Sequence, residues 1–407
     1  MVAMPSATHT QPTTRLISPA RSLRGSLTLP GDKSISHRYA MLAGFASGTS
    51  RLTNFSTGAD PHSSLACMAA MGAKVRTEGR SIEVTGTAGK LHQPPANLDC
   101  GNSGSTMRML SGLVAAQPGT FRFIGDESLT KRPMERIGKP LEQMGARVSL
   151  TDGHAPMTIH GSQLHAIDFE APIASAQVKT AVLFAGLQAN GTTSFAETVR
   201  TRDHTEHALR AFGAELLRRD DRLYIAGGQQ LHAIDATVPG DISSAAFFLC
   251  AALLFEDSNL VLDALGMNPT RASLLDVITT LGGQIKVLDL QDQHGEMLGR
   301  LRHPALVCRH HEQHAGHRAD AGQHVRHEPL VAWHVHEGQP LPVRQRRPGE
   351  PEVDGHPAGA FLRPAIRLHS RQGTDERGLS MVDVTGGRDD MHGQLSRSRA
   401  RPTARTT

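Results

Sequence analysis

The chain has 407 residues, 38% of them hydrophobic and 20% charged, which is typical of globular proteins with more than one domain. Its most apolar stretch, 245–255, is only 11 residues long, whereas a membrane-spanning helix needs roughly 18, so we expect no integral membrane protein. The 43 basic and 39 acidic side chains nearly balance, and one Trp, two Tyr and 12 Phe offer few surfaces for base stacking, which disfavours nucleic acid as a partner. The four cysteines include no CxxC pair, so we expect a reducing compartment, the cytoplasm.

Residues 1–21 are rich in Ser, Thr and Arg and contain no acidic residue. We interpret them as a flexible N-terminus, with an organelle transit peptide as the alternative. They lack the apolar segment of a secretory signal.

A pattern then recurs in which an amphipathic helix ends on a large apolar residue, a glycine follows, and an alternating segment begins. The four glycines are 73, 68 and 69 residues apart, at Gly72, Gly145, Gly213 and Gly282. Glycine suits the left-handed position after a helix, and alternation suits a half-buried strand. The sequence therefore predicts an α/β fold made of repeated units of about 70 residues.

Several loops open these helices with anion-binding chemistry. The first, Gly31-Asp-Lys33-Ser34-Ile-Ser-His-Arg38, places a lysine, a serine and an arginine in the first two turns of a helix. Backbone N–H groups and the helix dipole attract an anion there, and Arg38 adds a two-pronged donor. Alone, such a segment is more often a solvated basic turn.

Similar loops follow along the chain. Asn102–Arg108 carries Gly104 before an apolar helix, Lys131-Arg132-Pro133 puts two cations before a helix, and Ser175-Ala-Gln177 supplies uncharged donors. Thr201–Glu206 adds a charged helix start, and Pro239-Gly-Asp241 repeats the turn at Pro30. Each segment alone could be an ordinary cap, but together they predict a cleft that binds more than one phosphate or carboxylate.

In this order and spacing, the motifs from Gly31 to Ser244 resemble those of the 5-enolpyruvylshikimate-3-phosphate synthase family over about residues 22–295. The related UDP-N-acetylglucosamine enolpyruvyl transferases are the alternative, but they typically have Lys-Asn where this chain has Lys33-Ser34. The resemblance implies two lobes of βαβαββ units. It places the first lobe at 31–238 and a partial second lobe at 22–30 plus 239–295.

The resemblance also implies that the enolpyruvyl group of phosphoenolpyruvate is transferred to the 5-hydroxyl of shikimate-3-phosphate, with release of phosphate. This step belongs to the shikimate pathway of aromatic amino-acid biosynthesis, and glyphosate targets its phosphoenolpyruvate site. No cofactor and no metal are implied. The expected partners are the two small-molecule substrates, not nucleic acid or a membrane, and the expected state is a monomer.

Carried over by position, Lys33 is the implied catalytic residue and lies close to both substrates. The implied shikimate-3-phosphate ligands are Lys33, Ser34, Arg38, Ser175, Ala176, Gln177 and Arg202. The implied phosphoenolpyruvate ligands are Lys33, Gly104, Arg132 and Gln177.

The last part of the chain departs from the family. Residues 301–407 hold 12 of the 23 His and 16 Arg but no Lys, Asn or Tyr, and the family's acidic, Lys-Glu-Ser-Asp-Arg and Asp-His-Arg motifs are missing after Gly295. We interpret 296–407 as an aberrant, disordered tail produced by a shifted reading frame. A non-catalytic shikimate-3-phosphate binding remnant is thus an alternative function, and chance clustering explains Cys308–His317 better than a zinc site.

Overall fold

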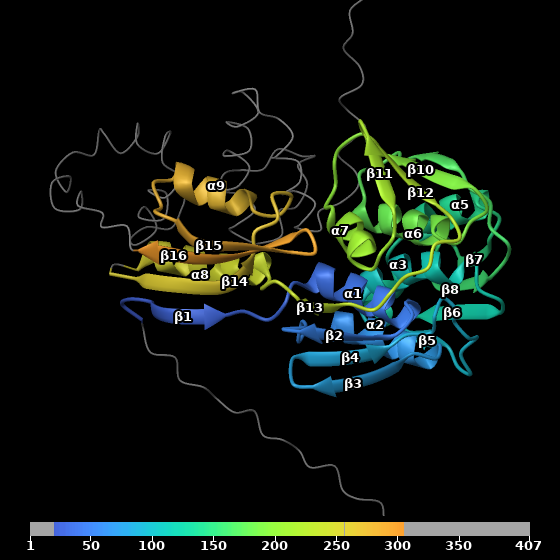
Figure 1. Ribbon diagram of the computed structural model, residues 1–407, viewed down its shortest axis with the longest axis horizontal. Coiled ribbons are helices and arrows are strands. Elements are labelled where there is room, and N and C mark those ends of the chain that lie inside the picture. The colour runs from blue at the N-terminus through green and yellow to red at the C-terminus, as the bar shows by residue number, and fades with distance from the viewer. Residues whose placement is uncertain (1–19, 256, 305–407) are drawn as a thin grey trace, which may run out of the picture.

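The computed structural model describes residues 20–255 and 257–304. They form two lobes of unequal size that meet at the chain crossovers (Figure 1). Within these residues, none of the helices combines the length and the apolar character that a membrane crossing requires. The expected tail beyond Pro304 and the Cys308–His317 segment lie outside the described residues.

The larger lobe contains three four-stranded sheets, each with its helices. The sheet orders are β13-β2-β4-β3, β5-β6-β8-β7 and β9-β10-β12-β11. Its strands are β2 (Thr49–Thr53), β3 (Lys74–Glu78), β4 (Ser81–Thr85), β5 (Leu98–Asp99), β6 (Thr120–Ile124), β7 (Arg147–Thr151), β8 (His154–His160), β9 (Asp168–Glu170), β10 (Thr192–Ala196), β11 (Leu216–Arg219), β12 (Arg222–Ala226) and β13 (Asp235–Thr237). Its helices are α1 (Lys33–Phe45), α2 (Ala59–Ala70), α3 (Gly104–Val114), α4 (Glu127–Thr130), α5 (Glu135–Gln143), α6 (Ala176–Gly186) and α7 (His204–Ala211).

The smaller lobe repeats the same arrangement once, with the sheet order β1-β14-β16-β15. Its elements are β1 (Arg24–Thr28), α8 (Ile242–Leu254), β14 (Asn259–Gly266), α9 (Ser273–Thr280), β15 (Lys286–Gln293) and β16 (Glu296–Pro304). In all four sheets an edge strand runs parallel to its neighbour, and the other pairings are antiparallel. The mixed α/β class and the repeated unit predicted from the sequence are thus confirmed.

The repeat glycines do what their spacing predicts. Gly72, Gly145, Gly213 and Gly282 follow α2, α5, α7 and α9 with positive φ values of 113°, 102°, 93° and 88°. Residues other than glycine rarely adopt this backbone conformation, which turns the chain out of the helix. Each helix therefore stops where the next strand can begin.

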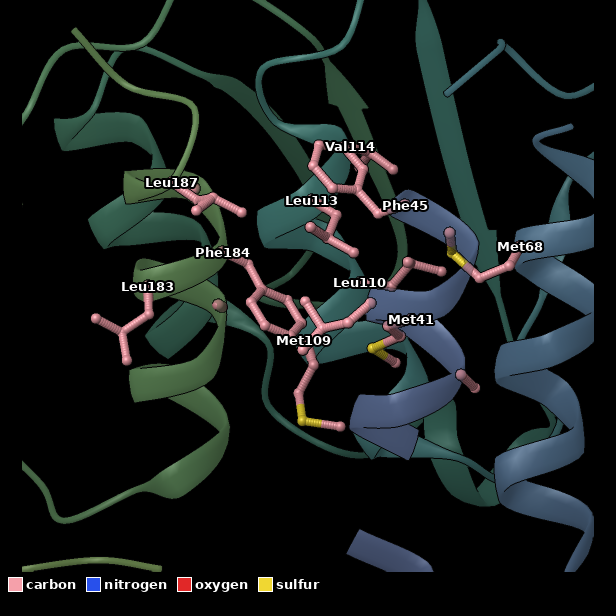
Figure 2. Close-up of a cluster of buried hydrophobic side chains, with 14 of the residues drawn as sticks. Met41, Phe45, Met68, Met109, Leu110, Leu113, Val114, Leu183, Phe184 and Leu187 are labelled. Carbon is pink, nitrogen blue, oxygen red and sulfur yellow. The ribbon is translucent and has the colours of Figure 1, made fainter. Parts of the chain in front are cut away.

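The larger lobe is held together by three central helices. Side chains of α1, α3 and α6, among them Met41, Leu110 and Phe184, interdigitate in a core that excludes water (Figure 2). Helices wrapped in apolar contacts on most sides leave mainly their ends accessible. The polar N-terminal ends of α1, α3 and α6 are consequently the places where this lobe can carry a site.

One boundary differs from expectation. Glu296–Pro304, expected to start the disordered tail, forms β16, which pairs with both β14 and β15. A tight hairpin turn at His294-Gly295, both with positive φ, joins β15 to β16. The unusual composition was counted over 301–407, which includes only the last four residues of β16, and the start at 296 was taken from the family motifs that are missing after Gly295. Neither observation indicates whether 296–304 pairs with other strands.

Candidate active site

The start of α1 follows the Pro30-Gly31 turn. The Asp32 side chain caps the helix by accepting the backbone N–H groups of Ser34 (2.7 Å) and Ile35 (3.0 Å). Lys33 opens the helix with a half-exposed side chain, and its ammonium pairs with Asp60 of α2. Asp32 thus orders the turn, while Lys33 stands at the surface of the helix end.

Arg38 lies one turn further along α1 and is buried. Its Nε donates to Thr205 Oγ1 (2.6 Å), its NH2 to Thr180 Oγ1 (3.0 Å) and its NH1 to the carbonyl of Ser34 (2.9 Å). Burial lowers the pKa of Arg38 to about 10, so the guanidinium remains charged at neutral pH. The geometry joins the starts of α1, α6 and α7 around one positive charge.

The starts of α3 and α6 meet through Gln177. Its Oε1 accepts from Arg108 NH1 (2.9 Å), and its Nε2 donates to Ser105 Oγ (3.0 Å). Ser175 caps α6 by accepting the N–H of Val178 (3.4 Å), and Ala176 is the first residue of that helix. The Ser-Ala-Gln segment therefore lies against the Gly104 loop, as the motifs require.

Gly104 begins α3 in a crowded place. A Cβ atom there would lie 3.1 Å from Arg108 NH1 and 3.5 Å from Arg132 NH1. Arg132 is oriented by Asn102, whose carbonyl and Oδ1 accept its NH1 (3.2 Å) and NH2 (2.6 Å). The absence of a side chain at Gly104 keeps space beside two guanidinium groups, a suitable place for a small anion.

A buried network ties α1 to α3. The His37 ring contacts Ser64 Oγ (2.7 Å), which contacts Thr106 Oγ1 (2.8 Å), and Thr106 donates to the Ser103 cap (2.7 Å). Burial lowers the pKa of His37 to about 3, so the ring stays neutral. Hydrogen bonds between uncharged groups thus set the relative position of the N-terminal ends of α1 and α3.

Sequence reasoning missed the buried ion cluster beneath the start of α7. Lys179 Nζ lies 2.8 Å from Glu206 Oε1 and 3.1 Å from Glu197 Oε1, and Arg218 pairs with the same two carboxylates at 3.1 and 3.4 Å. Two cations and two carboxylates balance the charge, which a buried cluster needs. Glu197 also accepts the N–H of Thr201 (3.0 Å) and so orders the segment that carries Arg202.

The structure thus brings most predicted residues to one end of the larger lobe. Direct contacts connect Arg38 with Ser34, and Gln177 with the loop of Gly104, whereas Lys33 pairs with Asp60 instead of another predicted residue. Arg202 is half-buried beside α7. Among the described residues, no three His, Cys, Asp or Glu side chains gather in a way that could hold a metal.

A hollow of about 460 Å³ lies elsewhere, beyond the C-terminal ends of α3 and α6. Its lining has no charged side chain: Ala116, Pro118, Gly161, Ser162, Gln163, Leu164, Gln188 and Asn190. The cations predicted to bind substrate lie toward the N-terminal ends of the helices, so we place the candidate active site at that end of the lobe.

Fold and site together define a two-lobed α/β protein of repeated units, in which several helix N-termini and arginines gather at one end of the larger lobe. The family model described as EPSP synthase (3-phosphoshikimate 1-carboxyvinyltransferase) matches residues 17–305. The chain belongs to this family, as its sequence motifs predicted.

Similar proteins agree with this assignment. The 3-phosphoshikimate 1-carboxyvinyltransferase of Koribacter versatilis is 57% identical over 286 residues, covering 70% of this chain and 67% of that protein. The protein of the same name from Bacillus subtilis is 43% identical over 287 residues, covering 69% and 66%. A solved structure of EPSP synthase from Acinetobacter baumannii superimposes with a TM-score of 0.67 at 40% identity, covering 70% of this chain and 65% of that one. The matched region therefore spans about two thirds of the length of these relatives, and the UDP-sugar alternative is not favoured.

Proposed function

We propose that this chain transfers the enolpyruvyl group of phosphoenolpyruvate to the 5-hydroxyl of shikimate-3-phosphate and releases phosphate. In this reaction the 5-hydroxyl oxygen bonds to C2 of phosphoenolpyruvate, an enol phosphate, as the hydroxyl loses its proton and the methylene carbon gains one. The resulting tetrahedral intermediate then loses a methyl proton and its phosphate, which leaves the enol ether product. The proposal includes a cytoplasmic, monomeric protein that acts in the aromatic branch of amino-acid biosynthesis.

One observation supports the proposal above the others: Arg38 of α1, buried and charged, is held by hydroxyl groups of α6 and α7 where the N-terminal parts of these three helices meet. A buried guanidinium held in this way is a preorganised partner for a phosphate or carboxylate. Ser34, Ser175, Ala176, Gln177 and Arg202 belong to the same helix ends, and we assign them with Lys33 and Arg38 to shikimate-3-phosphate.

The phosphoenolpyruvate side of the site is assigned to Lys33, Gly104, Arg132 and Gln177. Gly104 lies beside Arg108 and Arg132 and adds no side chain between them and a ligand, and Gln177 already contacts Arg108. Positive groups here would stabilise the charge of the phosphate as it departs. Lys33, exposed at the start of α1, is the proposed proton-transfer group of the described residues.

The test combines binding with turnover. Calorimetry with shikimate-3-phosphate and the full chain should show binding, and phosphate release should appear when phosphoenolpyruvate is added. Arg38→Lys should weaken shikimate-3-phosphate by roughly tenfold or more, since a single ammonium cannot replace the fork between Thr180 and Thr205. Lys139→Met, at an exposed pair with Glu135, is the matched control. Absence of both binding and release would contradict the proposal.

A second candidate is binding of shikimate-3-phosphate without turnover. It is favoured by the family match ending at residue 305 and by its coverage of about two thirds of the relatives' length. Because the first-lobe groups are present, binding would survive the loss of catalytic groups from the other lobe. Binding with no phosphate release in the same experiment would establish this candidate in place of the transferase.

A further inference from the structure

The cap of α7 differs from the caps of α1 and α8. Asp32 and Asp241 use their carboxylates to accept N–H groups of their own helices. Asp203 occupies the same position before α7 but makes no side-chain cap hydrogen bond. Its Oδ1 accepts instead from Asn268 Nδ2 (2.8 Å), which belongs to the smaller lobe. A favourable local cap has thus been exchanged for a contact across the lobes.

The next residue makes a second crossing contact. His204 Nδ1 lies 2.7 Å from Glu296 Oε1, and both side chains are only 2% exposed. Asn268 Nδ2 also donates to Glu296 Oε2 (3.2 Å), so one amide connects both contacts. A carboxylate this deeply buried is stable only when its partners are fixed, which makes the contact specific in geometry.

These contacts lead directly to the proposed substrate site. Asp203 and His204 lie between Arg202 on one side and Thr205 on the other, and Thr205 Oγ1 holds Arg38 Nε at 2.6 Å. A displacement of the α7 start would therefore move both arginines. Lys179 supports the same segment through the Thr201 carbonyl. From the smaller lobe, Asn268 and Glu296 make the short contacts to it, and Thr270 Oγ1 adds a longer one to Asp203 Oδ1 (3.4 Å).

We propose that Glu296 and Asn268 are positioning residues that act through Asp203 and His204 to set Arg202 and Arg38 for shikimate-3-phosphate. The smaller lobe then contributes to binding of this substrate without touching it. The inference rests on the proposed function, because it concerns the affinity of the same site.

The experiment compares two contacts made by the same hairpin. Glu296→Ala removes the partner of His204, whereas Gln293→Ala removes only the acceptor of the Thr237 N–H on β13 (2.8 Å). Calorimetry on the full chain should show a Kd for shikimate-3-phosphate raised roughly tenfold in Glu296→Ala and less than about twofold in Gln293→Ala. Equal losses in both variants would mean general lobe docking and would overturn the proposal.

A double-mutant cycle separates positioning from general stability. In an Arg202→Ala background, Glu296→Ala should reduce the affinity for shikimate-3-phosphate clearly less than in the wild type, because Arg202, one of the two arginines that Glu296 positions, is already absent. Fully additive losses would contradict the proposal. If Glu296→Ala does not fold, Glu296→Gln replaces it, because the glutamine keeps one oxygen for His204 but loses the carboxylate oxygen that accepts from Asn268. An unchanged Kd for shikimate-3-phosphate in Glu296→Gln would likewise overturn the proposal. Failure of the wild type to bind shikimate-3-phosphate would instead reject the proposed function.

Discussion

Asp32 and Asp241 occupy equivalent places in the two lobes, and one guanidinium nitrogen of Arg271 lies 3.7 Å from a carboxylate oxygen of each. Both aspartates follow a Pro-Gly turn where the chain crosses between lobes. The crossovers run side by side, since the N–H of Asp32 donates to the Pro239 carbonyl (2.7 Å) and that of Asp241 to the Pro30 carbonyl (3.0 Å). Both helix caps therefore share one arginine at the connection of the lobes.

Arg271→Met should destabilise the protein by about 3 kcal/mol at pH 7, because two neighbouring buried carboxylates lose their shared cation. Burial and then Asp32 already raise the pKa of Asp241, whereas the pKa of Asp32 is lowered, so protonation of Asp241 should reduce the loss as the pH falls toward 4.5. Urea unfolding at the two pH values measures it. Arg300→Met, at a more exposed pair with Asp263, should cost less than about 1 kcal/mol. Equal costs for both variants would contradict the argument.

Lys179→Met should cost about 3–5 kcal/mol of unfolding free energy, since it leaves Glu197 and Glu206 with Arg218 as their remaining cation in the buried cluster. Lys131→Met, which breaks an exposed i,i+4 pair with Glu127, should cost roughly 0–1 kcal/mol. Denaturant unfolding of both variants checks the prediction. A small loss for Lys179→Met would show that the cluster contributes little.

Gly104→Ala should weaken phosphoenolpyruvate and glyphosate more than shikimate-3-phosphate. The added methyl group would lie 3.1 Å from Arg108 NH1 and occupy space beside Arg132. Titration of each ligand, with phosphoenolpyruvate and glyphosate added to the shikimate-3-phosphate complex, measures the difference. Gly138→Ala, whose methyl group meets only ordinary contacts with Val148 and Leu150, is the control. Equal weakening of all ligands would point to a general distortion of α3.

The interaction of His207 with Asp203 predicts a pH dependence. The hydrogen bond to Asp203 raises the pKa of His207 above its ordinary value. A raised folded-state pKa means that the stabilisation is complete below about pH 6.5, the unfolded value, and is lost as pH rises through the folded value. Unfolding free energies should therefore fall more between pH 6 and pH 9 in the wild type than in His207→Gln. Parallel curves for the two proteins would contradict this.

The smaller lobe exposes part of α8, where Phe247 is 80% exposed and Leu254 is 52% exposed. Exposed aromatic side chains on an apolar helix favour self-association. The proposed functional state is a monomer, so this association should be non-specific and grow with protein concentration. Phe247→Ser should reduce it in sedimentation velocity at high concentration while changing the unfolding free energy by no more than about 0.5 kcal/mol. Undiminished association would mean that another surface is responsible.

Local patterns were enough to predict the repeated unit and several helix starts. The glycines that end α2, α5, α7 and α9 can be recognised from their regular spacing in the sequence. Glycine recurs there because the turn out of each helix requires a positive φ. Ser175, expected at a helix start, does cap α6, and Ser103 of the Asn102–Arg108 loop caps α3. Such features depend on neighbours within a few residues, so the linear sequence contains them.

The tertiary structure decided the partners of the buried charges. Lys179 meets Glu206 across 27 residues and His204 meets Glu296 across 92, and periodicity carries no information about such pairs. The structure also decided that Glu296–Pro304 is a strand, because its order comes from pairing with β14 and β15. The sequence by itself therefore determined the family, the repeats and the anion-binding residue types. Only the packing of four helix starts against one another, and of one lobe against the other, determined which charges are fixed in place.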